Sequence, residues 1–91
     1  MITLEIDPYG LICASGALKG SYKRHIEHQR TTGCPDFMRQ AIREHLEGMA
    51  ETHAVMLVAL RGAGYLMNDS DLEPVDLDDL MAIEWSPKPA R

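Results

Sequence analysis

The sequence predicts an α+β domain in which an N-terminal β-hairpin packs on two or three helices; a mainly α fold is the alternative. Three patterns lead to this prediction: an alternating apolar start, a turn signature directly after it, and a long amphipathic stretch over residues 36–61. Ninety-one residues suit one domain, 1–91, with a radius of gyration of about 12 Å. Residues 86–91, which hold two prolines, are expected to form a frayed tail.

The predicted hairpin occupies residues 2–14. Apolar and polar residues alternate from Ile2 to Ile6, a period of two that is typical of a half-buried strand. Residues 7–10, DPYG, place Asp, Pro and Gly at the first, second and fourth positions of a type I turn. Residues 11–14 would then return as the second strand.

A first helix is expected from about Ala17 to Gln29, with Ser15 or Gly16 as its N-cap. Gly20 weakens this helix by roughly 1 kcal/mol relative to alanine. The sequence TTGCP at residues 31–35 marks its end.

The central helix is predicted from Asp36 to about Arg61, because apolar residues recur there at steps of three and four. At about 1.5 Å per residue it would be about 39 Å long, which exceeds a globule roughly 30 Å across. Either Gly48 breaks this helix or a second subunit covers its excess length. Residues 55–60 are also compatible with a buried strand, although helix is favoured. Gly62 and Gly64 fit a C-terminal cap.

A short extended piece at residues 65–67 and a last helix are expected in the C-terminal third. Asp76 is the predicted N-cap of that helix, and Asp78 and Asp79 lie in its first turn. Pro87 prevents its continuation. Met81, Ile83 and Trp85 alternate with Ala82 and Glu84, so a strand that pairs with the N-terminal hairpin is the alternative.

Charge is divided along the chain, whose net charge is −5. Residues 17–45 hold six of the nine Lys and Arg against three acids, whereas residues 46–84 hold nine acids against Arg61. This division predicts a basic face and an acidic face for a partner. The candidate partner-binding residues are Lys19, Lys23, Arg24 and Arg30 on the basic side and Asp69, Asp71, Glu73, Asp76, Asp78 and Asp79 on the acidic side.

The first functional hypothesis is a small non-enzymatic accessory protein that docks on a larger macromolecule through these charged faces. Regularly spaced carboxylates can imitate the phosphates of a nucleic acid, so an inhibitor or regulator of a nucleic-acid-handling protein, of the kind that phages and mobile elements carry, fits the pattern. The second hypothesis is a nucleic-acid-binding regulator that uses residues 17–30, with Tyr22 stacking on a base. The acidic net charge opposes nucleic-acid binding by the whole chain.

The third hypothesis is a small metal-binding protein. Asp69, Asp71 and Glu73 match the opening of a calcium-binding EF-hand loop, but Pro74 and Leu80 stand where that loop needs Gly and Glu. A zinc site on His25, His28 and Cys34 lacks a fourth ligand at a recognised spacing, and His45 and His53 are too far apart around a helix to form a tight pair. No metal or cofactor is therefore expected.

Catalytic signatures are absent from the sequence. It contains no GxSxG, Walker loop, Rossmann glycine pattern or HExxH, and any pairing of Cys13 or Cys34 with a histidine would depend on the fold. We therefore expect a protein that is not an enzyme. The start of the chain does not resemble a secretory signal and the longest apolar run is short, so a cytoplasmic, membrane-free protein with reduced thiols is expected. A homodimer is also expected, because a domain this short buries little of its surface and self-association would stabilise it.

Overall fold

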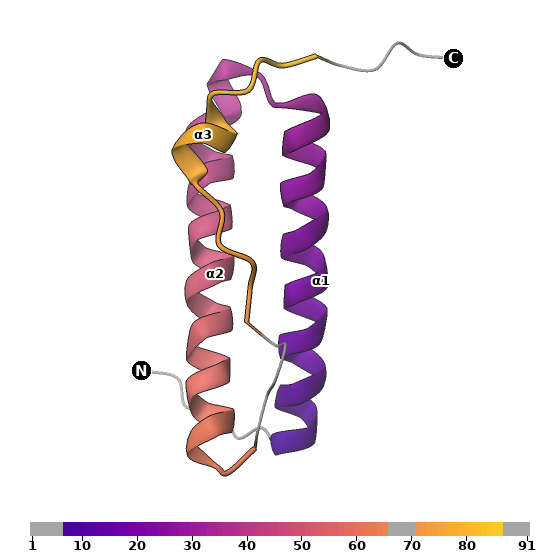
Figure 1. The fold of residues 1–91 in the computed structure, drawn as a ribbon, viewed down its shortest axis with the longest axis vertical. Helices are drawn as coiled ribbons and strands as arrows, with labels where there is room; N and C mark the ends of the chain where they lie inside the picture. The colour runs from indigo at the N-terminus through magenta and orange to yellow at the C-terminus, as the bar shows by residue number, and fades with distance from the viewer. Residues whose placement is uncertain (1–6, 66–70, 87–91) are drawn as a thin grey trace, which may run out of the picture.

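Two long antiparallel helices and a C-terminal segment that lies along them make up the fold (Figure 1). The computed structural model describes residues 7–65 and 71–86. Helix α1 spans Pro8–Thr32, a 3-10 turn spans Asp36–Met38, helix α2 spans Arg39–Gly62, and the short helix α3 spans Leu77–Met81. We refer to residues 71–86, which include α3, as the C-terminal segment.

The N-terminal hairpin prediction is wrong, and the described fold is mainly α rather than α+β. Residues 11–14, the predicted return strand, belong to α1, and residues 7–10 begin that helix instead of forming a β-turn. Asp7 is the N-cap and its Oδ1 atom accepts a hydrogen bond from the Gly10 backbone nitrogen at 2.7 Å. The predicted strand at residues 2–6 lies outside the described residues.

Helix α1 therefore starts earlier than expected and continues through Ser15, Gly16 and Gly20 without a break. Ser15 is buried inside the helix rather than capping it, and its hydroxyl donates to the Ile12 carbonyl oxygen at 3.0 Å. The predicted stop after residue 30 is confirmed: Gly33 follows the last turn with φ of 70°, a left-handed conformation that favours glycine.

Helix α2 confirms the predicted central helix from Arg39 onwards, including residues 55–60, and Gly48 does not interrupt it; residues 36–38 form a 3-10 turn instead of its first turn. Its length no longer requires a second subunit, because α1, with 25 residues, runs beside the 24 residues of α2. The elongated hairpin extends 46 Å along its longest axis, and its radius of gyration of 15.7 Å exceeds the value expected for a globule. Neither helix, within the described residues, is long and apolar enough to cross a membrane.

The C-terminal segment returns along the hairpin towards the α1–α2 turn (Figure 1). Asp76 caps α3 as predicted, since its Oδ1 atom accepts from the backbone nitrogens of Asp78 at 3.0 Å and Asp79 at 3.3 Å. Residues 81–85 do not form the alternative strand. Instead, the Ser86 nitrogen donates to the Thr32 carbonyl oxygen at 2.7 Å, which joins the segment to the end of α1.

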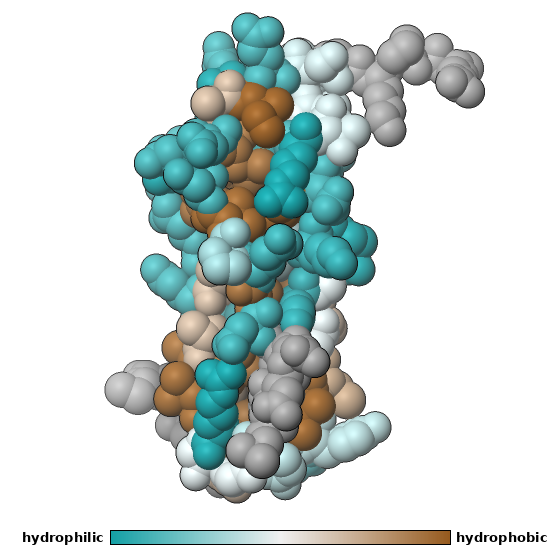
Figure 2. All heavy atoms as spheres, viewed as in Figure 1, coloured by the Kyte–Doolittle hydropathy of each residue, from teal (hydrophilic) through white to brown (hydrophobic). Residues whose placement is uncertain are grey.

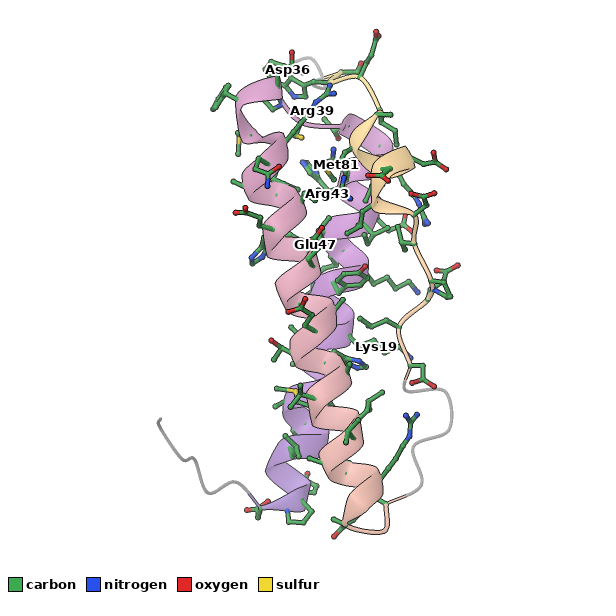
Figure 3. All side chains as sticks on the ribbon, turned by 90° about the vertical axis from the view of Figure 1, so that its left-hand side faces the viewer. Lys19, Asp36, Arg39, Arg43, Glu47 and Met81 are labelled. Carbon is green, nitrogen blue, oxygen red and sulfur yellow. The ribbon has the colours of Figure 1, made fainter. Side chains whose placement is uncertain are left out.

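The core lies where these three parts meet. Its buried members are Tyr22, Ile26, Leu46, Met49, Leu80 and Met81, and apolar residues of all three parts pack around them. Figure 2 shows apolar residues along the seam between the helices, with polar residues covering the flanks. Arg43 of α2 reinforces the contact with α3, because its guanidinium donates to the carboxylate of Asp78. It also donates to Glu47, one turn further along α2 (Figure 3).

Candidate functional site

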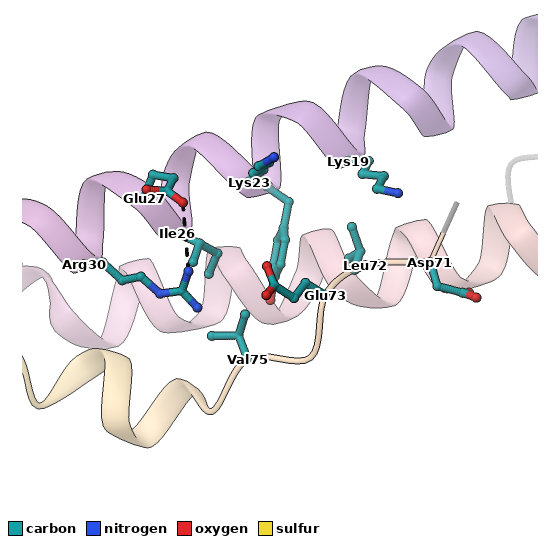
Figure 4. A pocket seen from close by; sticks show the side chains of 10 residues that line it. Lys19, Lys23, Ile26, Glu27, Arg30, Asp71, Leu72, Glu73 and Val75 are labelled. Carbon is teal, nitrogen blue, oxygen red and sulfur yellow. Dashed lines mark ion pairs between the residues drawn. The ribbon is translucent and has the colours of Figure 1, made fainter. Parts of the chain in front are cut away.

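A groove runs between α1 and the first residues of the C-terminal segment (Figure 4). Its volume is about 320 Å³. Ligand pockets measure roughly 300 to 1,000 Å³, so this groove is at the small end of that range. Its size fits one or two side chains better than a large cofactor.

The floor of the groove is apolar. Tyr22 and Ile26 form the α1 side of the floor, and Leu72 and Val75 form the side that belongs to the C-terminal segment. All four pack in or against the core, so the floor is held by the same contacts that stabilise the fold. Burial raises the pKa of the Tyr22 phenol.

The rim of the groove carries both signs of charge. Lys19, Lys23 and Arg30 line it from α1, while Asp71 and Glu73 line it from the C-terminal segment. Glu27 lies among the α1 cations, and its Oε1 atom is 4.0 Å from Arg30 Nη1. Because both side chains are exposed to solvent, this ion pair contributes little to stability. The fold thus brings members of the predicted basic and acidic faces to one groove instead of displaying them on separate surfaces.

Several predicted acidic residues are engaged by the chain itself. The Arg61 Nη2 atom donates to both carboxylate oxygens of Asp71, at 3.0 and 3.1 Å. Asp78 pairs with Arg43, and Asp76 caps α3. Glu73 makes no ion pair or side-chain hydrogen bond with the described residues, and Asp69 lies outside them. The carboxylates therefore do not form a uniform row like the phosphates of a nucleic acid.

The predicted basic residues are also divided. Lys23 lines the groove and forms no ion pair within the part of the chain described. Arg24 is exposed but does not line the groove, because successive residues point about 100° apart around a helix. Adjacent cations in the sequence thus face different surroundings.

The proposed zinc ligands are not assembled. The Cys34 thiol is buried and its sulfur accepts a hydrogen bond from Gln29 Nε2 at 3.3 Å, whereas His28 is exposed. Among the residues that the structure describes, no group of three or more His, Cys, Asp or Glu side chains is placed to hold a metal ion. Asp71 and Glu73, the described residues of the stretch that matches the opening of an EF-hand loop, belong to no such group.

The structure brings together one pair of side chains whose contact the sequence analysis does not predict. The rings of His25 on α1 and His45 on α2 lie with their centroids 5.2 Å apart. Both residues are ten positions from Pro35 in the turn (35 − 25 and 45 − 35), so an antiparallel hairpin places them opposite each other. The pairing could have been found only from the correct helix topology.

The apolar run near the end of α2 is divided between the core and the surface, as a helix predicts and a buried strand at residues 55–60 would not. Val55 and Val58 are each 69% exposed, whereas Leu57 and Leu60 of the same run are buried. The run is thus half core and half surface.

Comparison with known proteins gives no family assignment. No protein-family model matches the chain, and neither a curated protein nor a solved structure matches it.

Proposed function

We propose that this chain is a small non-enzymatic accessory protein that docks on a larger protein and regulates it. The observation that carries the proposal is the groove between α1 and the C-terminal segment, with its apolar floor and its rim of both charge signs. The proposed occupant is a segment of the partner that presents one apolar side chain between an acidic and a basic side chain.

The size and floor of the groove favour an anchor side chain from a protein. Protein interfaces obtain most of their binding energy from a few side chains that fill desolvated pockets, and such pockets are surrounded by polar contacts that exclude water. Ile26, Leu72 and Val75 supply the apolar surface for an anchor of this kind.

The rim supplies the charge complementarity. Lys23 and Glu73 line the groove from its two walls, and neither forms an ion pair with the described residues. A partner acid would meet Lys23 and a partner base would meet Glu73, which fixes the orientation of the bound segment. Complementary charges of this kind contribute mainly to specificity and to the association rate.

Direct nucleic-acid binding has less support. Affinity for phosphates comes from Lys and Arg that displace counterions. Glu27, Asp71 and Glu73 share the groove with the α1 cations, and their carboxylates would repel a phosphate backbone there. The proposed regulator therefore acts on a protein, whether or not that protein itself handles nucleic acid.

Site-specific photo-crosslinking in the native host tests this proposal. A photoreactive amino acid replaces Glu27, which lines the groove, in one variant and His28, which is exposed but does not line it, in a matched control one position away on the same helix. We expect a discrete protein adduct from position 27 that is much weaker from position 28. Equal adducts from both positions, or none from position 27, would contradict docking at the groove.

A shift assay separates the alternative function. At low salt, neither duplex nor single-stranded nucleic acid should bind the purified chain, and Lys23→Glu together with Arg24→Glu should change nothing. A salt-sensitive shift that this double variant removes would favour the nucleic-acid-binding regulator instead.

A further inference from the structure

We propose that His25 and His45 form a binding site for a divalent transition-metal ion of the zinc and copper class, which joins α1 to α2. The site lies on a different part of the hairpin from the groove described above, since neither histidine lines that groove. It is independent of the proposed docking function.

The tautomer of His25 suits metal binding. Its Nδ1 atom lies 2.7 Å from the Ser21 carbonyl oxygen, which can only accept a hydrogen bond, so Nδ1 carries the proton. The neutral ring then keeps its lone pair on Nε2. Metal-binding histidines usually donate their other ring nitrogen to a carbonyl or carboxylate in this way, which fixes the ring and increases the basicity of the ligand atom.

The spacing of the two rings suits a single ion. Zinc lies about 2.0–2.1 Å from an imidazole nitrogen, and each ring centre lies about 1.1 Å further away, so two imidazoles on one tetrahedral ion have centroids about 5 Å apart. The observed separation of His25 and His45 is 5.2 Å. The interplanar angle of 56° leaves the rings tilted rather than stacked.

Solvent completes the coordination. Both histidines are exposed, and His45 borders an open hollow that residues of α2 and Leu18 of α1 line. The Glu44 carboxylate accepts a hydrogen bond from Gln40 at 3.0 Å, so it is not counted among the ligands. Two protein ligands with water give a weaker site than a closed three- or four-ligand zinc site. Imidazole ligands select zinc, copper and nickel over magnesium and calcium, which prefer oxygen.

Titration of the tag-free protein with zinc chloride tests the site. We expect one ion per chain and, at ten times the dissociation constant, a rise in Tm of about 5 °C or more, since an ion that binds only the folded state stabilises it. Calcium chloride at the same concentration should give no rise. His25→Ala and His45→Ala should each abolish the zinc effect, while His28→Ala, one helical turn from His25 and equally exposed, should retain it.

Nuclear magnetic resonance of the wild-type histidine rings gives a readout that needs no variant. On addition of zinc the ring nitrogens of His25 and His45 should shift, and those of His28 and His53 should not. The proposal is overturned if zinc gives no Tm rise, if His28→Ala loses the effect as fully as His25→Ala, or if zinc doubles the molecular mass with one ion per two chains.

Discussion

The backbone of Glu84 lies so close to Gly33 that a Cβ atom at position 33 would stand 2.7 Å from the Glu84 carbonyl oxygen. Gly33 also has a φ of 70° and a ψ of −159°, a combination that is nearly exclusive to glycine. One residue thus ends α1, turns the chain towards α2 and makes room for the C-terminal segment.

Replacement of Gly33 by alanine should therefore reduce the free energy of unfolding by about 2–4 kcal/mol, because it adds backbone strain and a clash with Glu84. Gly64→Ala is the matched control: φ is 92°, but nothing lies within 4 Å of the added Cβ atom. It should cost about 1–2 kcal/mol. Urea unfolding measures the free energy of unfolding of both variants. Equal losses in the two variants would contradict the close approach of the C-terminal segment to Gly33.

Removal of the α3 cap should loosen the C-terminal segment. Asp76→Ala deletes the acceptor of two backbone hydrogen bonds and should cost about 1 kcal/mol, with faster hydrogen exchange at residues 77–81. Asp76→Asn keeps a good N-cap and should behave like wild type. If the asparagine variant loses as much protection as the alanine variant, the charge of Asp76 matters rather than its capping bonds.

Stability should fall as the medium becomes acidic, because His53 is buried beneath the C-terminal segment. Burial lowers the pKa of His53 below its usual value of 6.5, Lys19 on α1 lowers it further, and Asp71 on the segment opposes the shift. Glu47 and Glu51 of α2 and Tyr22 of α1 border the same hollow. The unfolded chain therefore binds the proton more readily than the folded one.

It follows that the contribution of neutral His53 is complete above a pH of about 6.5 and is lost as the pH falls from there through the folded pKa. His53→Leu should remove this part of the pH dependence, whereas His28→Leu at an exposed position should not. Urea unfolding at several pH values between 7.5 and 5 measures the slopes. Identical slopes for wild type and His53→Leu would rule out this role.

The two thiols should react at different rates. Cys13 is exposed on α1, whereas Cys34 is buried and 3% exposed. A thiol reagent should modify one cysteine rapidly in the native protein and the second only on unfolding, and Cys13→Ser should remove the rapid phase. Rapid modification of Cys34 would show that the region around the turn is more open than the structure describes.

Local sequence patterns predict the elements whose pattern is compatible with only one kind of structure. The periodicity of residues 36–61, the glycine break after α1 and the cap at Asp76 all correspond to structure. The sequence does not predict the start of α1 correctly, because Asp and Pro at residues 7 and 8 suit both a type I turn and the N-cap and first position of a helix. Gly16 and Gly20 then reduced the apparent helix propensity over a stretch that packing with α2 nevertheless keeps helical.

The candidate site was only partly accessible from the sequence. Lys19, Lys23, Arg30, Asp71 and Glu73 were named from charge alone, and all five line the groove. The sequence does not predict that Leu72 and Val75 line the groove, because their role depends on contacts with α1 residues about fifty positions away. Charge patterns also could not show that Arg61 and Arg43 of α2 would engage Asp71 and Asp78.

The docking of the C-terminal segment on α1 creates the groove, and one measurement addresses it directly. Nuclear Overhauser effects between the Tyr22 ring protons and the methyl groups of Leu72 and Val75 report whether these side chains meet in solution. We expect clear cross-peaks to both methyl-bearing residues, together with non-random chemical shifts over residues 72–75. Absence of these cross-peaks, with random-coil shifts in the segment, would mean that the groove does not exist and that the proposed docking site is wrong.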